Sequence, residues 1–204
     1  MKDKLQMILF VLVMGAILTT ALVTIDAITE PYIKANQLKK LQMSVLGVAG
    51  IEYTEENREQ VFAESIETKP FPDYLQPKDA DEDKKLKFYV TSDNQIIFEF
   101  KGNGLQGEIH GAIALMDDLD TIKGITIIKQ EETPGLGGRI GEAEFLNQFK
   151  NKKLFPELKI TRQGKASGIN EVDGITGATL SCNALEEVLN SESQKYIPAI
   201  KEIR

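Results

Sequence analysis

The residues best suited to chemistry lie in a glycine- and hydroxyl-rich segment, Asp173–Ser181, which reads DGITGATLS. Apolar residues at helical spacing follow in CNALEEVLNS, so this segment is predicted to lead into a helix. A helix start offers unpaired backbone N–H groups and the positive end of the helix dipole, which suits a phosphate. The hydroxyls of Thr176, Thr179 and Ser181 add further polar groups. A plain helix cap by Thr176 or Thr179 explains the same pattern.

Two further glycine-rich loops fit the same kind of site. Gly102–Gly107 reads GNGLQG and Glu132–Gly138 reads ETPGLGG. In the second loop, Pro134 fixes one backbone angle and the glycines permit left-handed conformations, so the loop can present amides and Leu136 to a flat ring. A simple strand-to-helix connector accounts for these residues equally well. Segment 173–181 lacks the Lys-[Ser/Thr] ending of a P-loop, which argues against a nucleoside triphosphatase.

The remaining candidate groups give no catalytic residue and no metal site. His110 lies in the middle of a predicted strand, where a core or surface histidine is expected because a metal site needs several ligands. Cys182 is expected to be a small buried hydrophobe, with a reactive thiol at a helix start as the alternative. Glu131 and Glu132 are candidates either for acid–base work or for capping a turn.

Composition narrows the class of protein further. Asp and Glu (31) exceed Lys and Arg (24), giving a formal charge of −7, which argues against nucleic-acid binding. One cysteine excludes an intramolecular disulfide, a zinc ribbon and an iron–sulfur cluster. With 204 residues and 42% hydrophobic residues, the chain can form one domain with a real core and an appendage.

The appendage is predicted to be a membrane anchor. The run Leu5–Ile25 contains no charged residue and, as a helix, would extend roughly 32 Å, about the thickness of a bilayer core. It is longer than the core of a cleaved signal, and Thr24–Ala27 is a poor cleavage site. Lys2 and Lys4 precede the run, so residues 1–25 are expected to be a cytoplasmic N-terminus and anchor, with the rest outside.

Residues 26–85 are predicted to form a helical stalk and a linker containing proline and acidic residues. Pro31 is expected to end or bend the anchor helix. A short amphipathic helix is expected to follow it through Val45, and a polar helix over residues 52–64. Three prolines and the acidic run Asp79–Asp83 predict a surface loop over residues 65–85.

Residues 86–204 are predicted to form the main domain. Strand-like runs at 86–91, 96–100, 109–116 and 125–130 are separated by Asp-, Asn- and Gly-rich turns, which is typical of an antiparallel meander. A helix over Glu142–Lys150 and a further strand over 159–163 are expected before the last helix. The fold class is therefore α+β, a small antiparallel sheet flanked by helices and preceded by one transmembrane helix.

With these motifs the chain resembles a known family of redox proteins. It is similar to the FMN-binding domain of the C subunit of the Na+-translocating NADH:quinone oxidoreductase (Nqr) and of the related G subunit of the Rnf electron-transport complex. ETPGLGG at Glu132–Gly138 and DGITGATLS at Asp173–Ser181 carry the resemblance, in the family's order and separation. GNGL at Gly102–Leu105 and the single N-terminal span add to it. The resemblance covers most of residues 86–190 and the anchor.

The resemblance implies a covalent cofactor. In the family, a flavin transferase reads D-x-x-[Ser/Thr]-G-A-T and joins the last Thr hydroxyl to the phosphate of FMN, which assigns the attachment to Thr179. Transferase recognition then falls on Asp173, Thr176, Gly177, Ala178 and Thr179. The FMN contacts that it implies are Thr133, Leu136, Gly137, Thr176, Gly177, Ala178 and Leu180, with Gly104 and Leu105 as weaker matches.

The function implied is that of a membrane-anchored electron-transfer protein with covalent FMN. Its partners would be the other subunits of an ion-translocating NADH:quinone or ferredoxin:NAD oxidoreductase, and the flavin transferase during maturation. GNGL and the Gln130-x-Glu132-Thr133 context favour Nqr over Rnf, and Na+ as the ion. The expected location is the inner membrane, single-pass, with the soluble domain on the periplasmic side. An extracytoplasmic binding module without covalent flavin and a stand-alone flavoenzyme remain as alternatives.

Overall fold

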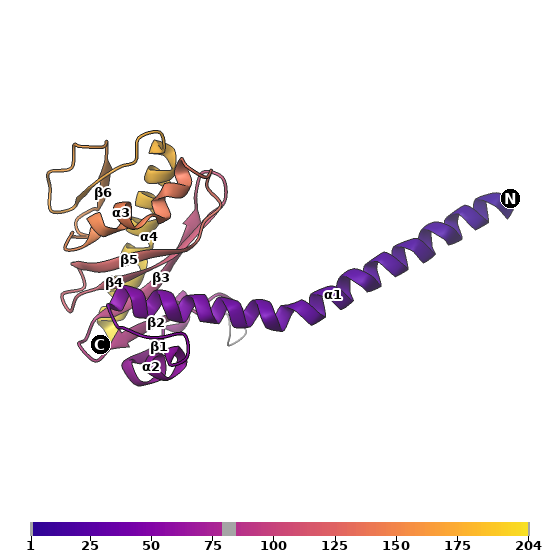
Figure 1. Cartoon of the computed structure of the whole chain (residues 1–204), viewed down its shortest axis with the longest axis horizontal. Coiled ribbons are helices and arrows are strands. Elements are labelled where there is room, and N and C mark those ends of the chain that lie inside the picture. Colours follow the sequence, from indigo (N-terminus) through magenta and orange to yellow (C-terminus); the bar gives the residue numbers. More distant parts are fainter. Residues whose placement is uncertain (1, 79–84, 204) are drawn as a thin grey trace. The chain divides into compact units, whose positions relative to one another are not determined.

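The computed structural model describes residues 2–78 and 85–203, and Figure 1 traces their elements. The chain divides into two compact units, Met1–Leu41 and Gln42–Arg204. The acidic run expected at Asp79–Asp83 lies outside the described residues.

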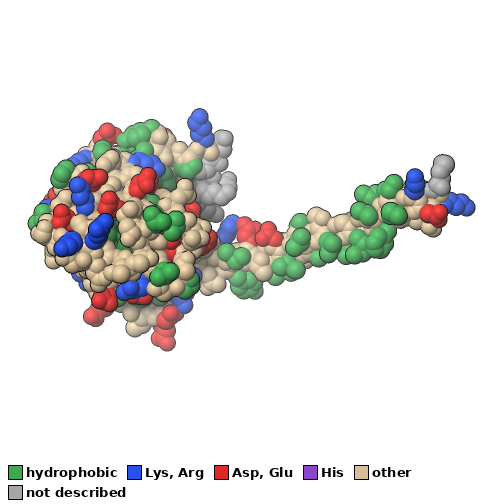
Figure 2. Space-filling model, turned by 90° about the horizontal axis from the view of Figure 1, so that it is seen from above, with side chains coloured by type: hydrophobic (Ala, Val, Ile, Leu, Met, Phe, Trp, Pro, Cys, Tyr) green, Lys and Arg blue, Asp and Glu red, His purple; other side chains and the backbone are tan. Residues whose placement is uncertain are grey.

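The first unit is helical. A single helix, α1 (Lys2–Ala49), passes through Pro31, so the expectation of a break or bend followed by a separate helix is wrong as to the break. Proline removes only its own N–H from the helical ladder, and the bonds on either side persist. The first half of α1 is long and apolar enough to cross a membrane. Figure 2 shows hydrophobic side chains along it, and those between Leu5 and Ile25 are exposed.

The second unit is built on one antiparallel sheet. Its strands, in both chain order and spatial order, are β1 (Ile66–Pro70), β2 (Lys87–Thr91), β3 (Ile96–Asn103), β4 (Glu108–Leu115) and β5 (Ile122–Lys129). Asn94 adopts a left-handed conformation in the β2–β3 turn, as its residue type permits. A short parallel pair, β6 (Lys159–Thr161) and β7 (Glu171–Asp173), follows. The α+β class and the antiparallel meander predicted from sequence are confirmed.

Helices and short 3₁₀ turns complete the second unit. They are α2 (Arg58–Ser65), α3 (Ala143–Leu146), α4 (Thr179–Ile203), η1 (Asp73–Leu75), η3 (Gly137–Gly141) and η4 (Asn147–Phe149). The amphipathic helix α4 packs on the sheet (Figure 1), with Leu185 and Leu189 almost fully buried. Burying each such side chain stabilises the fold by about 1.5–3 kcal/mol. The Tyr196 ring stacks on Phe71, with ring centroids 4.5 Å apart.

The last turns of α1 pack on the opposite face of the sheet. Ile97, Ala114 and Gly124 pair across β3, β4 and β5 and so form one row on that face. A Cβ on Gly124 would lie 3.1 Å from the carbonyl oxygen of Val48, so helix and sheet are in close contact. The Arg58 Nε–H donates to Gln42 Oε1 at 2.9 Å and holds the start of α2 to the same turns.

Two expectations for residues 52–85 need correction. The loop expected over residues 65–85 contains the edge strand β1, which pairs with β2 along its whole length. An edge strand tolerates Pro70 at its end because that position needs no inward N–H bond. Helix α2 starts at Arg58 and not near residue 52, since Thr54 and Asn57 exchange side chain–backbone hydrogen bonds that hold a turn.

Candidate functional site

The three glycine-rich segments meet at one buried carboxylate, that of Glu132, which is 4% exposed. Its Oε1 accepts hydrogen bonds from the backbone N–H groups of Leu105, at 2.7 Å, and Gln106, at 3.1 Å. Its Oε2 accepts from the hydroxyl of Ser181 at 2.6 Å. Glu132 therefore joins its own loop to the β3–β4 loop and to the first turn of α4.

Glycine is required where these segments approach the carboxylate most closely. A Cβ on Gly104 would collide with Glu132 Oε1, and one on Gly137 would collide with Ser181 Oγ. Neither neighbour can give way without losing its hydrogen bond. These two glycines, both predicted cofactor contacts, thus have a packing role whatever the site binds.

The start of α4 lacks a side-chain cap. Its first helical bond runs from the N–H of Cys182 to the carbonyl of Ala178, at 2.9 Å. Alanine in the cap position has no oxygen to offer, and the N–H groups of Thr179, Leu180 and Ser181 have no acceptor among the described residues. Three amides therefore remain open to an anion. The alternative in which a threonine caps the helix is wrong.

The three hydroxyls of segment 173–181 differ in their bonding. Thr176 donates to Gln163 Oε1, and Ser181 donates to Glu132. Thr179 is exposed at the first residue of α4, and its hydroxyl has no hydrogen-bond partner in the part of the chain that the structure describes. Of the three, the Thr179 oxygen is the one open to modification.

Apolar side chains stand beside the open helix start. Leu105, Leu136 and Leu180 are 50%, 49% and 61% exposed. Gly177 takes a left-handed conformation (φ +85°), and a Cβ there would touch Leu136 Cδ2 at 3.5 Å, so Leu136 lies against the turn before Thr179. A groove of about 520 Å³ includes Leu105 and Leu180 in its lining. Exposed leucines around a polar anion site suit a flat ring with a charged end.

Asp173 lies elsewhere in the site. Its carboxylate accepts hydrogen bonds from the N–H groups of Ala166, at 2.9 Å, and Lys165, at 2.8 Å. These bonds, that from Ala166 foremost, hold the pKa of Asp173 below its usual value. The side chain thereby stabilises the turn before β7. Its role in transferase recognition stays a prediction.

Cys182 and His110 take structural positions. Cys182 is buried, the N–H of Ile175 donates to its sulfur at 3.4 Å, and burial raises the pKa of the thiol. The prediction of a small buried hydrophobe is confirmed. His110 Nε2 lies 2.8 Å from Glu99 Oε2, and Tyr89 donates to the other Glu99 oxygen at 3.3 Å. Among the described residues no group of three His, Cys, Asp or Glu side chains is arranged to hold a metal ion.

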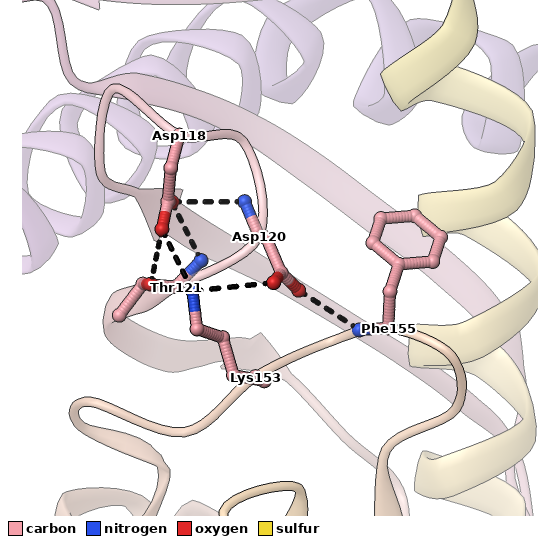
Figure 3. Close-up of polar contacts among 5 residues, drawn as sticks. All are labelled: Asp118, Asp120, Thr121, Lys153 and Phe155. Atoms are coloured by element: carbon pink, nitrogen blue, oxygen red, sulfur yellow. Dashed lines mark hydrogen bonds and ion pairs between the residues drawn. The ribbon is translucent and has the colours of Figure 1, made fainter.

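A separate polar cluster fixes the β4–β5 turn (Figure 3). Lys153 Nζ lies 2.8 Å from Asp118 and 3.2 Å from Asp120. Asp118 also accepts from the N–H groups of Asp120 and Thr121, and Asp120 accepts from the N–H of Phe155 at 2.9 Å. This cluster joins the turn to the 150–157 segment and contains none of the predicted cofactor contacts.

Fold and site together define a flavin-binding domain, and the comparisons with known proteins agree. Residues 104–192 match the FMN-binding domain family. That match begins at the first glycine loop and ends within α4, so it includes all three segments joined by Glu132.

The chain belongs to the family of C subunits of the Na(+)-translocating NADH-quinone reductase. It is 30% identical over 198 residues to that subunit of Vibrio vulnificus, with 77% of this chain and 78% of the relative covered. Identity to the Neisseria meningitidis protein of the same name is 36% over 132 residues, covering 61% of this chain and 51% of that relative.

Two solved structures share the fold. Shewanella oneidensis NqrC superposes with a TM-score of 0.66 at 22% identity, covering 76% of this chain and 91% of that one. The corresponding reductase C subunit from Parabacteroides distasonis gives a TM-score of 0.68 at 24% identity, covering 80% and 93%. The predicted resemblance to the Nqr family is confirmed.

Sequence reasoning missed the central role of Glu132. It treated that residue as an acid–base group or a turn cap, whereas the carboxylate bridges three segments. No periodicity marks such a residue, because its three donors come from positions 26 to 49 residues away.

Proposed function

We propose that this chain is the FMN-bearing electron-transfer subunit of an Na+-translocating NADH:quinone oxidoreductase, with FMN joined to Thr179 by a phosphoester. The observation that carries the attachment is the state of Thr179. Its hydroxyl is exposed and without a partner among the described residues, at a helix start whose first amides are open.

The residues present fit FMN. The open N–H groups of Thr179, Leu180 and Ser181 suit the phosphate, since helix starts favour anions. The exposed Leu105 and Leu136 offer apolar surface for the ring. When bound, FMN supplies the redox chemistry, and the chain supplies its position and electrostatics. A covalent link removes any dependence of occupancy on affinity.

The remaining site residues have supporting roles in this proposal. Thr133, Leu136, Gly137, Thr176, Gly177, Ala178 and Leu180 contact the flavin, with Gly104 and Leu105 beside them. The transferase recognises Asp173 and the T-G-A-T run that ends at Thr179. Gln163 and the turn at Lys165–Ala166 hold Thr176 and Asp173 in place.

The relatives are subunits of a membrane complex by name, which supports partner subunits here. We propose that α1 anchors the chain by the exposed apolar run between Leu5 and Ile25. Because Lys2 and Lys4 precede that run, we expect the N-terminus in the cytoplasm and the FMN-binding domain on the periplasmic side. One span cannot form an ion path, so the partners move the ion.

The decisive experiment is the intact mass of the chain after reaction with a flavin transferase. The expected gain is one FMN less one water, absent in Thr179→Ala. Thr176→Ala is the matched control, because it removes a hydroxyl from the same motif that is already bonded to Gln163. Thr179→Ser keeps a hydroxyl at the attachment position and should retain the gain.

Two outcomes would contradict the proposal. A mass gain that persists in Thr179→Ala places the ester on another residue. No gain in the unmodified chain, while the transferase modifies a known substrate, leaves a binding module without covalent flavin as the better explanation.

A further inference from the structure

The buried carboxylate of Glu132 is unlike the other acidic residues of its loop. Glu131, its neighbour, has a side chain 53% exposed and forms an ion pair with Lys129 at 2.8 Å. Glu132 is 4% exposed and has no basic partner among the described residues. All its donors are neutral: two backbone N–H groups and one hydroxyl. A negative charge held in this way is poorly screened by salt and water.

The partners of that carboxylate are parts of the predicted cofactor site. Leu105 and Gln106 belong to the β3–β4 loop, and Ser181 is the third residue of α4, two after Thr179. The close approaches at Gly104 and Gly137 leave no space for a side chain around the same oxygens. The geometry of all three segments therefore depends on one side chain.

We propose that Glu132 is a positioning residue with two effects: it assembles the three segments into the site that receives FMN, and its charge lowers the reduction potential of the bound flavin. The inference rests on the proposed function and deepens it. A fixed negative charge beside a flavin disfavours the additional negative charge that reduction brings. Glu132 needs no contact with the ring for either effect.

Two substitutions separate the two effects. Glu132→Gln keeps an oxygen for the N–H groups of Leu105 and Gln106, and its amide N–H can donate to the hydroxyl oxygen of Ser181. It removes the charge and preserves the network. Glu132→Ala removes both and leaves two backbone donors unsatisfied. Glu131→Gln is the matched control, since it removes a neighbouring but exposed charge.

The first measurement needs no flavin. Amide hydrogen exchange in the full-length protein is expected to be faster at Leu105 and Gln106 in Glu132→Ala and near wild type in Glu132→Gln. Flavin transfer is expected to slow at least about tenfold in Glu132→Ala, as the loss of more than one buried hydrogen bond implies. Unchanged exchange in Glu132→Ala would overturn the assembly role, even if the chain accepts no flavin at all.

The second measurement is the midpoint potential of the flavinylated protein by spectroelectrochemistry. We expect a more positive potential in Glu132→Gln and the wild-type value in Glu131→Gln. Equal potentials in Glu132→Gln and wild type would refute the electrostatic effect. If Glu132→Ala does not fold, Ser181→Ala replaces it: transfer should slow while Leu105 and Gln106 stay protected, and an unchanged transfer rate would overturn the assembly role.

Discussion

The carboxylate of Glu132 and the hydroxyl of Ser181, 49 positions apart in the chain, lie 2.6 Å from each other in the interior. Both residues are almost completely buried. Their hydrogen bond fastens the start of α4 to the ETPGLGG loop, and with it the residue that we propose carries the flavin.

Ser181→Ala should therefore destabilise the full-length protein in detergent. It removes one of three donors to a buried carboxylate, and such a loss costs about 1–3 kcal/mol. Ser191→Ala is the control, because that hydroxyl donates only to the Val188 carbonyl of its own helix, at 3.1 Å. Chemical denaturation would measure both variants, and equal effects would contradict the importance of the Glu132–Ser181 bond.

Sequence patterns predicted the frame of this domain because the frame is local. Apolar runs separated by turn residues such as Asn94 predicted β2 to β5. The edge strand β1 was missed, because Pro70 and Pro72 and the acidic residues beyond them resemble a loop. An edge strand is formed by pairing with β2, which no local pattern shows.

The candidate site was only partly accessible to sequence reasoning. The glycine and hydroxyl pattern predicted where an anion could lie, and the structure adds the open amides at Thr179. The bond between Thr176 and Gln163 and the convergence on Glu132 depend on tertiary packing. Motif order alone could not provide these contacts.

Truncation should show that the last turns of α1 belong to the FMN-binding domain. A chain starting at Gln42 retains Val45 and Leu46, both fully buried, and should fold as a soluble domain. A chain starting at Ile51 loses them and should be less stable by about 3–6 kcal/mol. Thermal denaturation compares the two, and equal melting temperatures would contradict the packing of α1 on the sheet.

The Asp118 cluster should make stability depend on acid pH. Burial raises the pKa of Asp118, but hydrogen bonds from Lys153 and Thr121 outweigh it and hold the pKa far below its usual value. A lowered folded-state pKa contributes stability above the unfolded value, about 3.9, and that contribution is lost as pH falls through the folded value.

Asp118→Asn should accordingly cost about 1 kcal/mol near pH 6, a modest amount because the side chain is partly exposed. The difference from wild type should shrink as pH falls below about 4, where the wild-type advantage fades. Asp93→Asn, in the exposed β2–β3 turn, is the control. Urea denaturation across this pH range is the measurement, and a pH-independent difference would argue against the ionised Asp118.

Thiol labelling should establish the membrane orientation. The native Cys182 is buried and gives little background. Asp93→Cys is expected to react with an impermeant maleimide in intact spheroplasts, because the positive-inside rule places residues beyond Ile25 outside. Asp3→Cys should react only after permeabilisation. The reverse pattern would place the domain in the cytoplasm.

Leu136 should affect the environment of the flavin more than its attachment. The side chain is 49% exposed and touches the turn at Gly177, so Leu136→Ala removes apolar surface without opening the core. We expect the mass gain at Thr179 to persist, while the flavin absorption bands and fluorescence shift toward those of free FMN as water reaches the ring. Ile169→Ala, which removes a 65% exposed side chain from the loop before β7, should leave the spectrum unchanged. A spectrum insensitive to Leu136→Ala would mean that the ring lies away from the ETPGLGG loop.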